Sequence, residues 1–222
     1  MRGLFITFEG PDGSGKTTQM RRLCERLAAQ GADIVRTREP GGTPIGDRVR
    51  EIVLSPEHPE MKDETEILLY AASRAQHVRE VIVPAVAAGK VVVCDRFVDA
   101  SIAYQGYGLG RRPEEVAAVN RFATGGLLPD RTYLLDVPVA VSRERLLERA
   151  RETGGAGLDR IEQKASEYHE RVREGFLLIA KAEPQRVVVI DANRAVDDIA
   201  ADIEADFDRM FRNNIRSEED FE

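Results

Sequence analysis

The chain has 222 residues, of which 42% are hydrophobic and 32% charged, and its formal net charge is -7. This composition is too apolar for a disordered protein, and the charge gives no general reason to bind a polyanion, so nucleic acid and anionic membrane surfaces are not expected as partners. Only 5 of the 32 basic residues are lysine. Arginine is the side chain that binds phosphate bidentately, although a genome rich in arginine codons would give the same excess.

Short β-branched runs alternate with longer stretches of helical period, which is typical of an α/β protein with a parallel sheet. Five strands are expected, at residues 4–8, 33–37, 90–94, 132–135 and 186–190. Helices are expected at residues 16–29, 44–54, 63–88, 113–124, 140–151, 159–182 and 196–211. No linker divides the chain, so a single domain over residues 1–211 is predicted, with mobile segments at 152–158 and in a polar tail at 212–222.

Cys24 and Cys94 lie in apolar runs, and no leader-like segment precedes the first strand. We therefore expect a reduced, cytoplasmic protein. No apolar run approaches the roughly 20 residues that would span a bilayer.

A phosphate-binding motif of the form G-x-x-x-x-G-K-[ST] lies between the first strand and the first helix. It reads Gly10-Pro11-Asp12-Gly13-Ser14-Gly15-Lys16-Thr17. Its glycines let backbone N–H groups turn toward phosphate oxygens, and the following helix presents its positive end. Lys16 would reach the outer phosphates, and the Thr17 hydroxyl would bind Mg²⁺. A glycine turn that merely caps a helix is the alternative.

Asp95 follows the buried run 91–94 and is therefore expected at the carboxyl edge of the sheet. Ligands bind at that edge in open α/β folds, so Asp95 is predicted to join Thr17 at the metal. An aspartate that caps the next segment is the alternative interpretation.

Several arginines are expected near the same edge. Arg96 follows Asp95, while Arg38 and Arg48 flank the turn at residues 39–43. An arginine cluster without an obvious base favours an acceptor that is itself an anion, because a phosphate monoester is already nucleophilic at pH 7. Each arginine could also be an ordinary surface charge.

Two groups at helical spacing could form a pocket for a planar base. Tyr70 and Arg74 are i and i+4, and Ser101, Tyr104 and Gln105 are i, i+3 and i+4. A ring could stack on the base while the polar groups meet its edges. A Tyr–Arg cation–π pair and a polar helix surface would give the same pattern.

From residue 5 to about 211, the chain resembles the bacterial thymidylate kinases, which transfer the γ-phosphoryl group of ATP to dTMP. Six blocks in order carry the resemblance: residues 8–18, 38–43, 68–77, 95–97, 103–106 and 158–162. It implies a P-loop NTPase-type fold, a five-stranded parallel sheet with helices on both faces and a lid segment. It also implies a homodimer and a requirement for Mg²⁺.

The resemblance further assigns roles to individual residues. It implies that Asp12 holds the 3′-hydroxyl of the acceptor sugar and that Arg48 and Arg96 clamp its phosphate. Tyr70 would stack on thymine and Tyr104 would disfavour a ribose hydroxyl. The other implied acceptor residues are Glu39, Arg74, Ser101 and Gln105. ATP would bind along the loop from Gly10 to Thr18, with Arg194 beside adenine.

Residues 149–160 look like the lid of this family. In some relatives an arginine of the phosphate loop stabilises the transferring group, but position 13 here is Gly13. The resemblance then places that charge in the lid, with Arg149, Arg151 and Arg160 as candidates. Two positions depart from the usual pattern, Tyr70 in place of Phe and Phe97 in place of Tyr, which leaves the polarity of the pocket open.

Two other functions compete with this interpretation. One is a related kinase with another acceptor, against which the pair Arg48 and Arg96 argues if the acceptor is uncharged. The other is a nucleotide-dependent switch that hydrolyses ATP slowly; it would need no acceptor pocket.

Overall fold

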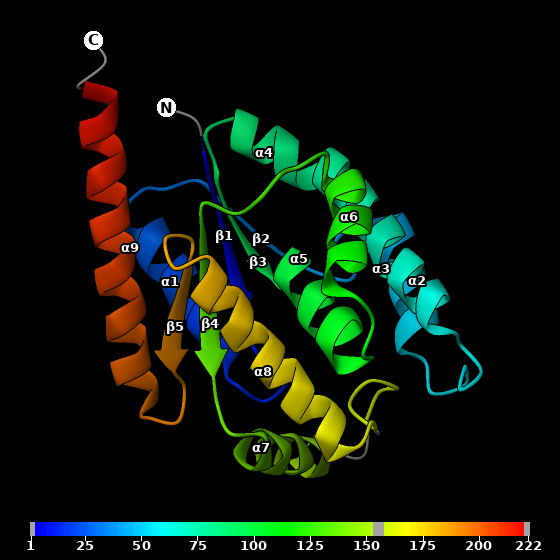
Figure 1. Ribbon diagram of the computed structural model, residues 1–222. Helices are drawn as coiled ribbons and strands as arrows, with labels where there is room; N and C mark the ends of the chain where they lie inside the picture. Colours follow the sequence, from blue (N-terminus) through cyan, green and yellow to red (C-terminus); the bar gives the residue numbers. More distant parts are fainter. Residues whose placement is uncertain (1–2, 153–157, 220–222) are drawn as a thin grey trace.

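The computed structural model describes residues 3–152 and 158–219, and a five-stranded parallel sheet forms its centre. The strands are β1 (Leu4–Glu9), β2 (Ile34–Arg38), β3 (Val91–Asp95), β4 (Arg131–Asp136) and β5 (Val187–Asp191). Their order is β2-β3-β1-β4-β5 (Figure 1). All five predicted strands are confirmed to within one residue at each end. Strands β1, β3 and β4 are largely buried, whereas the edge strands β2 and β5 are partly exposed. All five contain the β-branched residues that favour strands.

The helices lie between the strands, as the alternating pattern predicts. They are α1 (Lys16–Ala29), α2 (Pro44–Leu54), α3 (Asp63–His77), η1 (Val78–Ile82), α4 (Val83–Ala87), α5 (Val98–Ser101), η2 (Ile102–Gly108), α6 (Pro113–Thr124), α7 (Val139–Glu152), α8 (Ser166–Ala182) and α9 (Val196–Glu219), of which η1 and η2 are π-helical. Capping residues in the sequence fix where helices begin, as in α2. Thr43 caps α2 by accepting a hydrogen bond from Gly46 N at 3.0 Å, and Pro44 follows as the first helical residue.

Helices cover both faces of the sheet. Leu4, Ile6 and Phe8 of β1 pack in one core cluster with α1 and α9, on the left of Figure 1. Phe5, between them in sequence, packs in another cluster with η1 and α4. The alternation of side chains along a strand thus divides the core between the two faces.

The carboxyl ends of β1 and β3 bring the predicted site together. The two strands are direct neighbours, with Phe8 opposite Asp95. The loop that follows β1 and the residues that follow β3 therefore emerge side by side, at the edge where open α/β sheets bind ligands.

Two predicted helix boundaries are wrong, and one predicted helix is interrupted. The helix expected at 63–88 contains the π-helical turn η1, just before Pro84, whose ring and missing N–H disrupt the regular bonding pattern. The helix expected from 159 begins at Ser166, because the Asp159 side chain accepts hydrogen bonds from the N–H groups of Ile161 and Glu162 and forms a turn instead. Helix α9 continues to Glu219 instead of ending at 211, since no glycine or proline interrupts it.

The single domain over 1–211 and the lid at 149–160 stay predictions. Residues 153–157 of the expected mobile segment lie outside the described residues. Within the described ranges, no helix is long and apolar enough to cross a membrane.

Candidate functional site

The phosphate-binding motif forms a tight loop between β1 and α1. Gly10, Gly13 and Gly15 have positive φ angles of 131°, 78° and 92°, a region that other residues rarely adopt. The loop is also packed closely, since a Cβ atom on Gly13 would lie 2.6 Å from the carbonyl oxygen of Ser142. The sequence motif is therefore a constraint on backbone shape as well as on chemistry.

Lys16 and Thr17 open helix α1 at the end of this loop. Lys16 Nζ donates to the carbonyl oxygens of Gly10 (3.1 Å) and Pro11 (2.9 Å). Burial, followed by the nearby charge of Arg96, lowers the pKa of Lys16. The Thr17 hydroxyl donates to Asp95 Oδ2 at 3.1 Å, as expected of two groups that would share a metal ion.

These two oxygen groups fit Mg²⁺, which binds hard oxygen ligands and keeps several waters or phosphate oxygens in its shell. The described residues contain no group of three or more acidic, histidine or cysteine side chains that could hold an ion alone. A metal at Thr17 and Asp95 would therefore share its ligation with the phosphates of a bound nucleotide.

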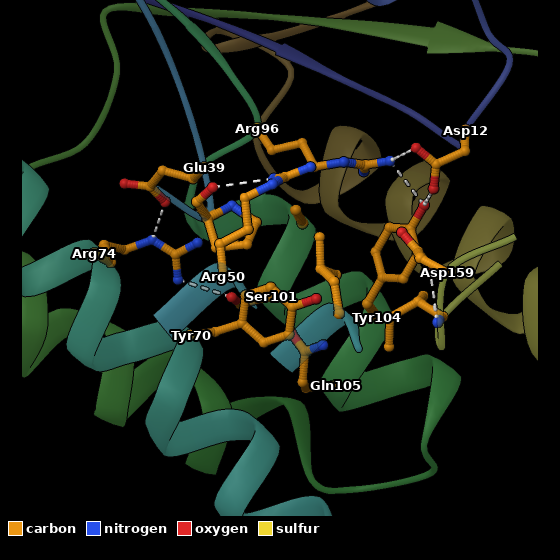
Figure 2. A pocket seen from close by; sticks show the side chains of 14 residues that line it. Asp12, Glu39, Arg50, Tyr70, Arg74, Arg96, Ser101, Tyr104, Gln105 and Asp159 are labelled. Atoms are coloured by element: carbon orange, nitrogen blue, oxygen red, sulfur yellow. Dashed lines mark hydrogen bonds and ion pairs between the residues drawn. The ribbon is translucent and has the colours of Figure 1, made fainter. Parts of the chain in front are cut away.

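Arg96 is held in a left-handed conformation after β3, with φ 70°. Its side chain reaches the phosphate loop, where Nη1 donates to Gly10 O at 3.0 Å and Nη2 to Asp12 Oδ1 at 2.8 Å (Figure 2). Nη2 also donates to the Tyr104 hydroxyl at 3.1 Å, and the guanidinium lies 4.8 Å from the centre of that ring. Burial would raise the pKa of Asp12, but the charges of Arg96 and Lys16 outweigh it and hold that pKa well below its ordinary value.

Glu9, the last residue of β1, supports the turn at Arg96. Its Oε1 accepts hydrogen bonds from the backbone N–H groups of Phe97 (2.7 Å) and Ala100 (3.3 Å). Its Oε2 is buried without a hydrogen-bond partner among the described residues. Burial, reinforced by Asp99, raises the pKa of Glu9 from 4.5 to about 8.

Arg74 is the centre of a second cluster, and only 2% of it is exposed. Its Nε donates to Glu39 Oε2 at 2.6 Å, and its Nη1 donates to Ser101 Oγ at 2.7 Å (Figure 2). Asn120 also accepts from Nη1. The ring against its guanidinium is Phe97, at 5.4 Å, and not Tyr70, so the alternative of a Tyr70–Arg74 cation–π pair is wrong.

Two adjoining chambers make up the site. The loop chamber is lined by residues that include Gly13, Gly15, Lys16, Thr17, Thr18 and Asp95. The helix chamber is lined by residues that include Tyr70, Arg74, Ser101, Tyr104 and Gln105. Five residues line both chambers: Asp12, Glu39, Arg50, Arg96 and Asp159. The arrangement can hold two ligands whose ends meet beside Asp12 and Arg96.

The structure does not bring Arg48 to either chamber, which corrects one expectation. Its side chain is 80% exposed and pairs with Glu51 at 3.0 Å. Arg50 lines both chambers instead, and its Nη1 donates to Pro40 O at 3.0 Å. Residues two apart on a helix point in nearly opposite directions, so only one of them can face the cleft.

The three candidate lid arginines separate in the structure. Arg149 lines the loop chamber and pairs with Glu162 at 2.9 Å. Arg151 instead lines a surface pocket along α7 with Ala140 and Leu147. Arg160 lines neither chamber, and its Nε donates to Val53 O at 2.9 Å. Arg149 is therefore the candidate that the geometry favours, and Arg151 and Arg160 are not placed to contact a ligand there.

Two other expected residues lie at the periphery. Arg38 lines the loop chamber and pairs with Asp47 at 3.1 Å. Arg194 follows β5, outside both chambers, where its Nε donates to Asp191 O at 3.1 Å and its Nη2 contacts Asp202.

Four residues of the site had no individual role predicted from the sequence: Glu9, Arg50, Asn120 and Asp159. Asp159 lies in the block 158–162 that resembles the family, and Glu9 lies beside the glycine loop, so their positions in the sequence were a usable signal. Arg50 and Asn120 carried no such signal, because the packing of a helix decides which of its polar residues face the interior.

Comparisons with known proteins agree on one family. The family model for thymidylate kinase matches residues 8–203. The thymidylate kinase of Exiguobacterium sibiricum is 54% identical over 203 residues, covering 91% of this chain and 93% of that protein. That of Geotalea uraniireducens is 49% identical over 203 residues, with 91% and 95% covered. The crystal structure of thymidylate kinase from Ehrlichia chaffeensis aligns with a TM-score of 0.75 at 32% identity, covering 94% of this chain and 99% of that one. The likeness confirms the predicted P-loop NTPase-type fold class.

Proposed function

The chain belongs to the thymidylate kinase family, and from that premise we propose that it transfers the γ-phosphoryl group of ATP directly to dTMP. Membership makes it an enzyme that phosphorylates dTMP in nucleotide synthesis. The observation that supports the finer proposal is the pair of chambers that share Asp12, Arg50 and Arg96. A donor phosphate in one chamber and an acceptor phosphate in the other would meet at these residues.

The loop chamber is proposed to take ATP. The backbone N–H groups of the glycine loop and the start of α1 bind phosphates, as at other helix N-termini. The loop from Gly10 to Thr18 would hold ATP, with Lys16 exchanging its carbonyl partners for phosphate oxygens. Thr17 and Asp95 would hold Mg²⁺, which neutralises charge on the phosphates when it is bound. Arg194, on the exposed turn after β5, stays a candidate contact for adenine.

The helix chamber is proposed to take dTMP. Tyr70 would stack on the base, while Arg74, with Ser101 and Glu39 fixing its position, would meet a base edge. Arg96 and Arg50 would hold the phosphate, and Asp12 and Tyr104 would meet the sugar. This assignment replaces Arg48 with Arg50 in the phosphate clamp, because only Arg50 lines the chamber.

Transfer is proposed to proceed in line, by attack of the acceptor phosphate on the γ-phosphorus. The acceptor oxygen is already anionic near pH 7, so no side chain has to remove a proton. The protein's task is then to position two anions and to offset their repulsion. Arg96, Arg149 and Lys16 all line the loop chamber and would supply positive charge there.

A coupled ADP-release assay with ATP and Mg²⁺ tests the proposal, using dTMP, dUMP, dCMP, UMP, AMP and thymidine as acceptors. We expect dTMP to give the greatest stimulation and thymidine, which lacks the phosphate, to give none. Turnover that no monophosphate raises above the rate with ATP alone would support a slow nucleotide hydrolase instead. A requirement for Mg²⁺ is checked in the same assay by chelation and restoration.

The family resemblance also leads us to propose a homodimer in the cytoplasm. Light scattering coupled to size-exclusion chromatography measures the mass directly, and a monomer at the enzyme's working concentration would contradict the proposed homodimer.

A further inference from the structure

The amide of Gln105 has one of its two ends fixed inside the protein. Gln105 is 2% exposed, lines the helix chamber and donates from Nε2 to Glu66 Oε1 at 2.9 Å. Among the described residues, none donates a hydrogen bond to its Oε1. The amide therefore offers the chamber an acceptor and keeps its donor for Glu66.

The orientation of this amide follows from the chemistry of Glu66. The carboxylate is 2% exposed and forms an ion pair with Arg160, in which Nη2 and Oε2 are 2.8 Å apart. A carboxylate paired with a guanidinium only accepts hydrogen bonds, so the amide must present its NH₂ group to it. The reverse orientation would bring two acceptor oxygens together.

Arg160 is fixed in turn by the end of helix α2. Its Nε donates to Val53 O at 2.9 Å, and its backbone N–H donates to Leu54 O at 3.1 Å. Its side chain is 11% exposed. A chain of contacts thus runs from Arg160, held at the end of α2, through Glu66 of α3 to Gln105 in the chamber wall. Each residue limits the orientation of the next.

Arg74 supplies the complementary group in the same chamber. Its guanidinium can only donate, whereas the free end of Gln105 can only accept. Thymine presents a carbonyl acceptor at C4 next to an N3–H donor. Cytosine presents an amino donor at C4 next to an N3 acceptor, so the same edge has the opposite polarity.

On this basis, and resting on the proposed function of the helix chamber, we propose that Glu66 and Arg160 are positioning residues for base selectivity. By fixing the amide of Gln105, they make the chamber accept the N3–H edge of thymine or uracil and reject cytosine. This also gives Arg160 a role other than the catalytic lid role expected from sequence.

The substitution Glu66→Gln tests the proposal. A neutral amide at position 66 can donate or accept, so Gln105 is free to turn and offer its NH₂ group to the chamber. We expect the ratio of kcat/KM for dTMP to that for dCMP to fall by on the order of tenfold or more. The ratio for dTMP to dUMP should stay constant, because both bases carry N3–H. A parallel fall for all three acceptors, or an unchanged dTMP to dCMP ratio, would overturn the proposal.

Asp99→Asn is the matched control. The pair of Asp99 and Arg186 has side-chain exposures of 3% and 11%, against 2% and 11% for Glu66 and Arg160, and Asp99 makes no hydrogen bond to Gln105. Both substitutions remove one buried carboxylate charge, so both should lower the melting temperature. Only Glu66→Gln should change base selectivity, and an equal change in Asp99→Asn would overturn the proposal.

A second variant separates a loss of base selectivity from a loss of folding. Glu66→Gln leaves the guanidinium of Arg160 buried without its partner, whereas Glu66→Gln combined with Arg160→Met removes that charge as well. The double variant should show the same loss of discrimination against dCMP.

Wild-type enzyme that fails to act on dTMP at all would count against the proposed function, whereas wild-type enzyme that uses dCMP as well as dTMP would count against this inference alone.

Discussion

Arg96 is held in a backbone conformation that costs non-glycine residues about 1–3 kcal/mol, and its neighbours explain how the chain sustains it. Its N–H donates to Phe8 O at 2.9 Å, and Glu9 accepts from the next N–H group. Its side chain forms a charge-assisted hydrogen bond with Asp12, worth about 1.5–3 kcal/mol. The strained turn thus aims a guanidinium at the junction of the two chambers.

Arg50 and Arg48 provide a direct test of which arginine meets the acceptor. Arg50→Ala should raise KM for dTMP by about tenfold or more, because it removes a charged donor from the wall of both chambers. Arg48→Ala is the control, since its exposed ion pair with Glu51 contributes about 0–1 kcal/mol to stability at most. Steady-state kinetics with dTMP varied distinguishes them. The reverse order of effects would restore Arg48 to the clamp.

Glu9 should give the folded protein a pH-dependent stability. Its pKa is raised from 4.5 to about 8 by burial and by Asp99, although Arg96 and Lys16 oppose the shift. Between these values the folded state retains a proton that the unfolded state has released, so this contribution to the free energy of unfolding decreases as pH rises from 4.5 through about 8.

Glu9→Gln removes that titration while keeping an acceptor for Phe97 N and Ala100 N. Urea unfolding across the same pH range should therefore give a flatter profile for Glu9→Gln than for wild type. Glu174→Gln, at an exposed position on α8, should keep the wild-type profile. Parallel profiles for wild type and Glu9→Gln would show that Glu9 titrates normally.

At the scale of the elements, the π-helical segment η2 carries Tyr104 and Gln105 into the helix chamber. Helix α8 packs against it where both elements have glycine. A Cβ atom on Gly175 would lie 2.6 Å from the Tyr107 ring, and one on Gly108 would lie 2.7 Å from Tyr168 and from Val172. The two elements can approach closely only because these positions have no side chain.

Gly175→Ala should consequently destabilise the protein by about 1–3 kcal/mol, since the added methyl group overpacks the contact with Tyr107. Denaturant unfolding measures the loss. Glu174→Ala on the same helix is the control and should change stability by less than about 0.5 kcal/mol. A neutral or stabilising effect of Gly175→Ala would mean that η2 and α8 separate at little cost.

Helix α7 offers a similar contrast between two of its own residues. Arg149 lines the loop chamber, whereas Arg151 lines the separate surface pocket along α7. Arg149→Ala should lower kcat about 10²–10³-fold, the scale seen when a donor to developing charge is removed. Arg151→Ala should leave kcat near the wild-type value. Single-turnover rates separate this effect from product release, and equal losses in both variants would contradict the assignment of Arg149.

At the scale of the whole molecule, an acidic chain forms a cleft for anions by concentrating a few arginines at one edge of its sheet. The net charge is -7, and many arginines outside the cleft are paired with carboxylates, such as Arg26 with Asp208 at 2.8 Å. Arg50 and Arg96 line the junction of the two chambers. Local charge decides which ligand binds in the cleft, and bulk charge does not.

The shared walls of the two chambers predict strong binding of a compound that joins adenosine to thymidine through a chain of phosphates. It should raise the melting temperature more than ATP and dTMP together at equal concentrations, because one molecule then occupies both chambers. A compound with the same phosphate chain and adenosine at both ends is the control. A rise no larger than that with ATP alone would indicate that the chambers cannot be filled together.

The sequence by itself determined the five strands, the glycine loop and the residues at the strand ends. These features are local: strands are short runs rich in β-branched residues, and a phosphate loop needs glycine at fixed spacing. Helical spacing indicated a candidate pocket, and the resemblance assigned its residues to the acceptor. All five line one chamber: Tyr70, Arg74, Ser101, Tyr104 and Gln105. The family and its P-loop fold class were predicted from the six sequence blocks that resemble thymidylate kinases.

Only the tertiary structure decided which of several similar residues face the cleft. Arg50 rather than Arg48 lines it, because the packing of α2 fixes the rotation of that helix about its axis. Arg160 lies beside Glu66 only because a turn at 158–162 packs against α2 and α3, and no local pattern encodes that contact. Side-chain direction and long-range pairing depend on the assembled core, which is why residue types could be predicted and their partners could not.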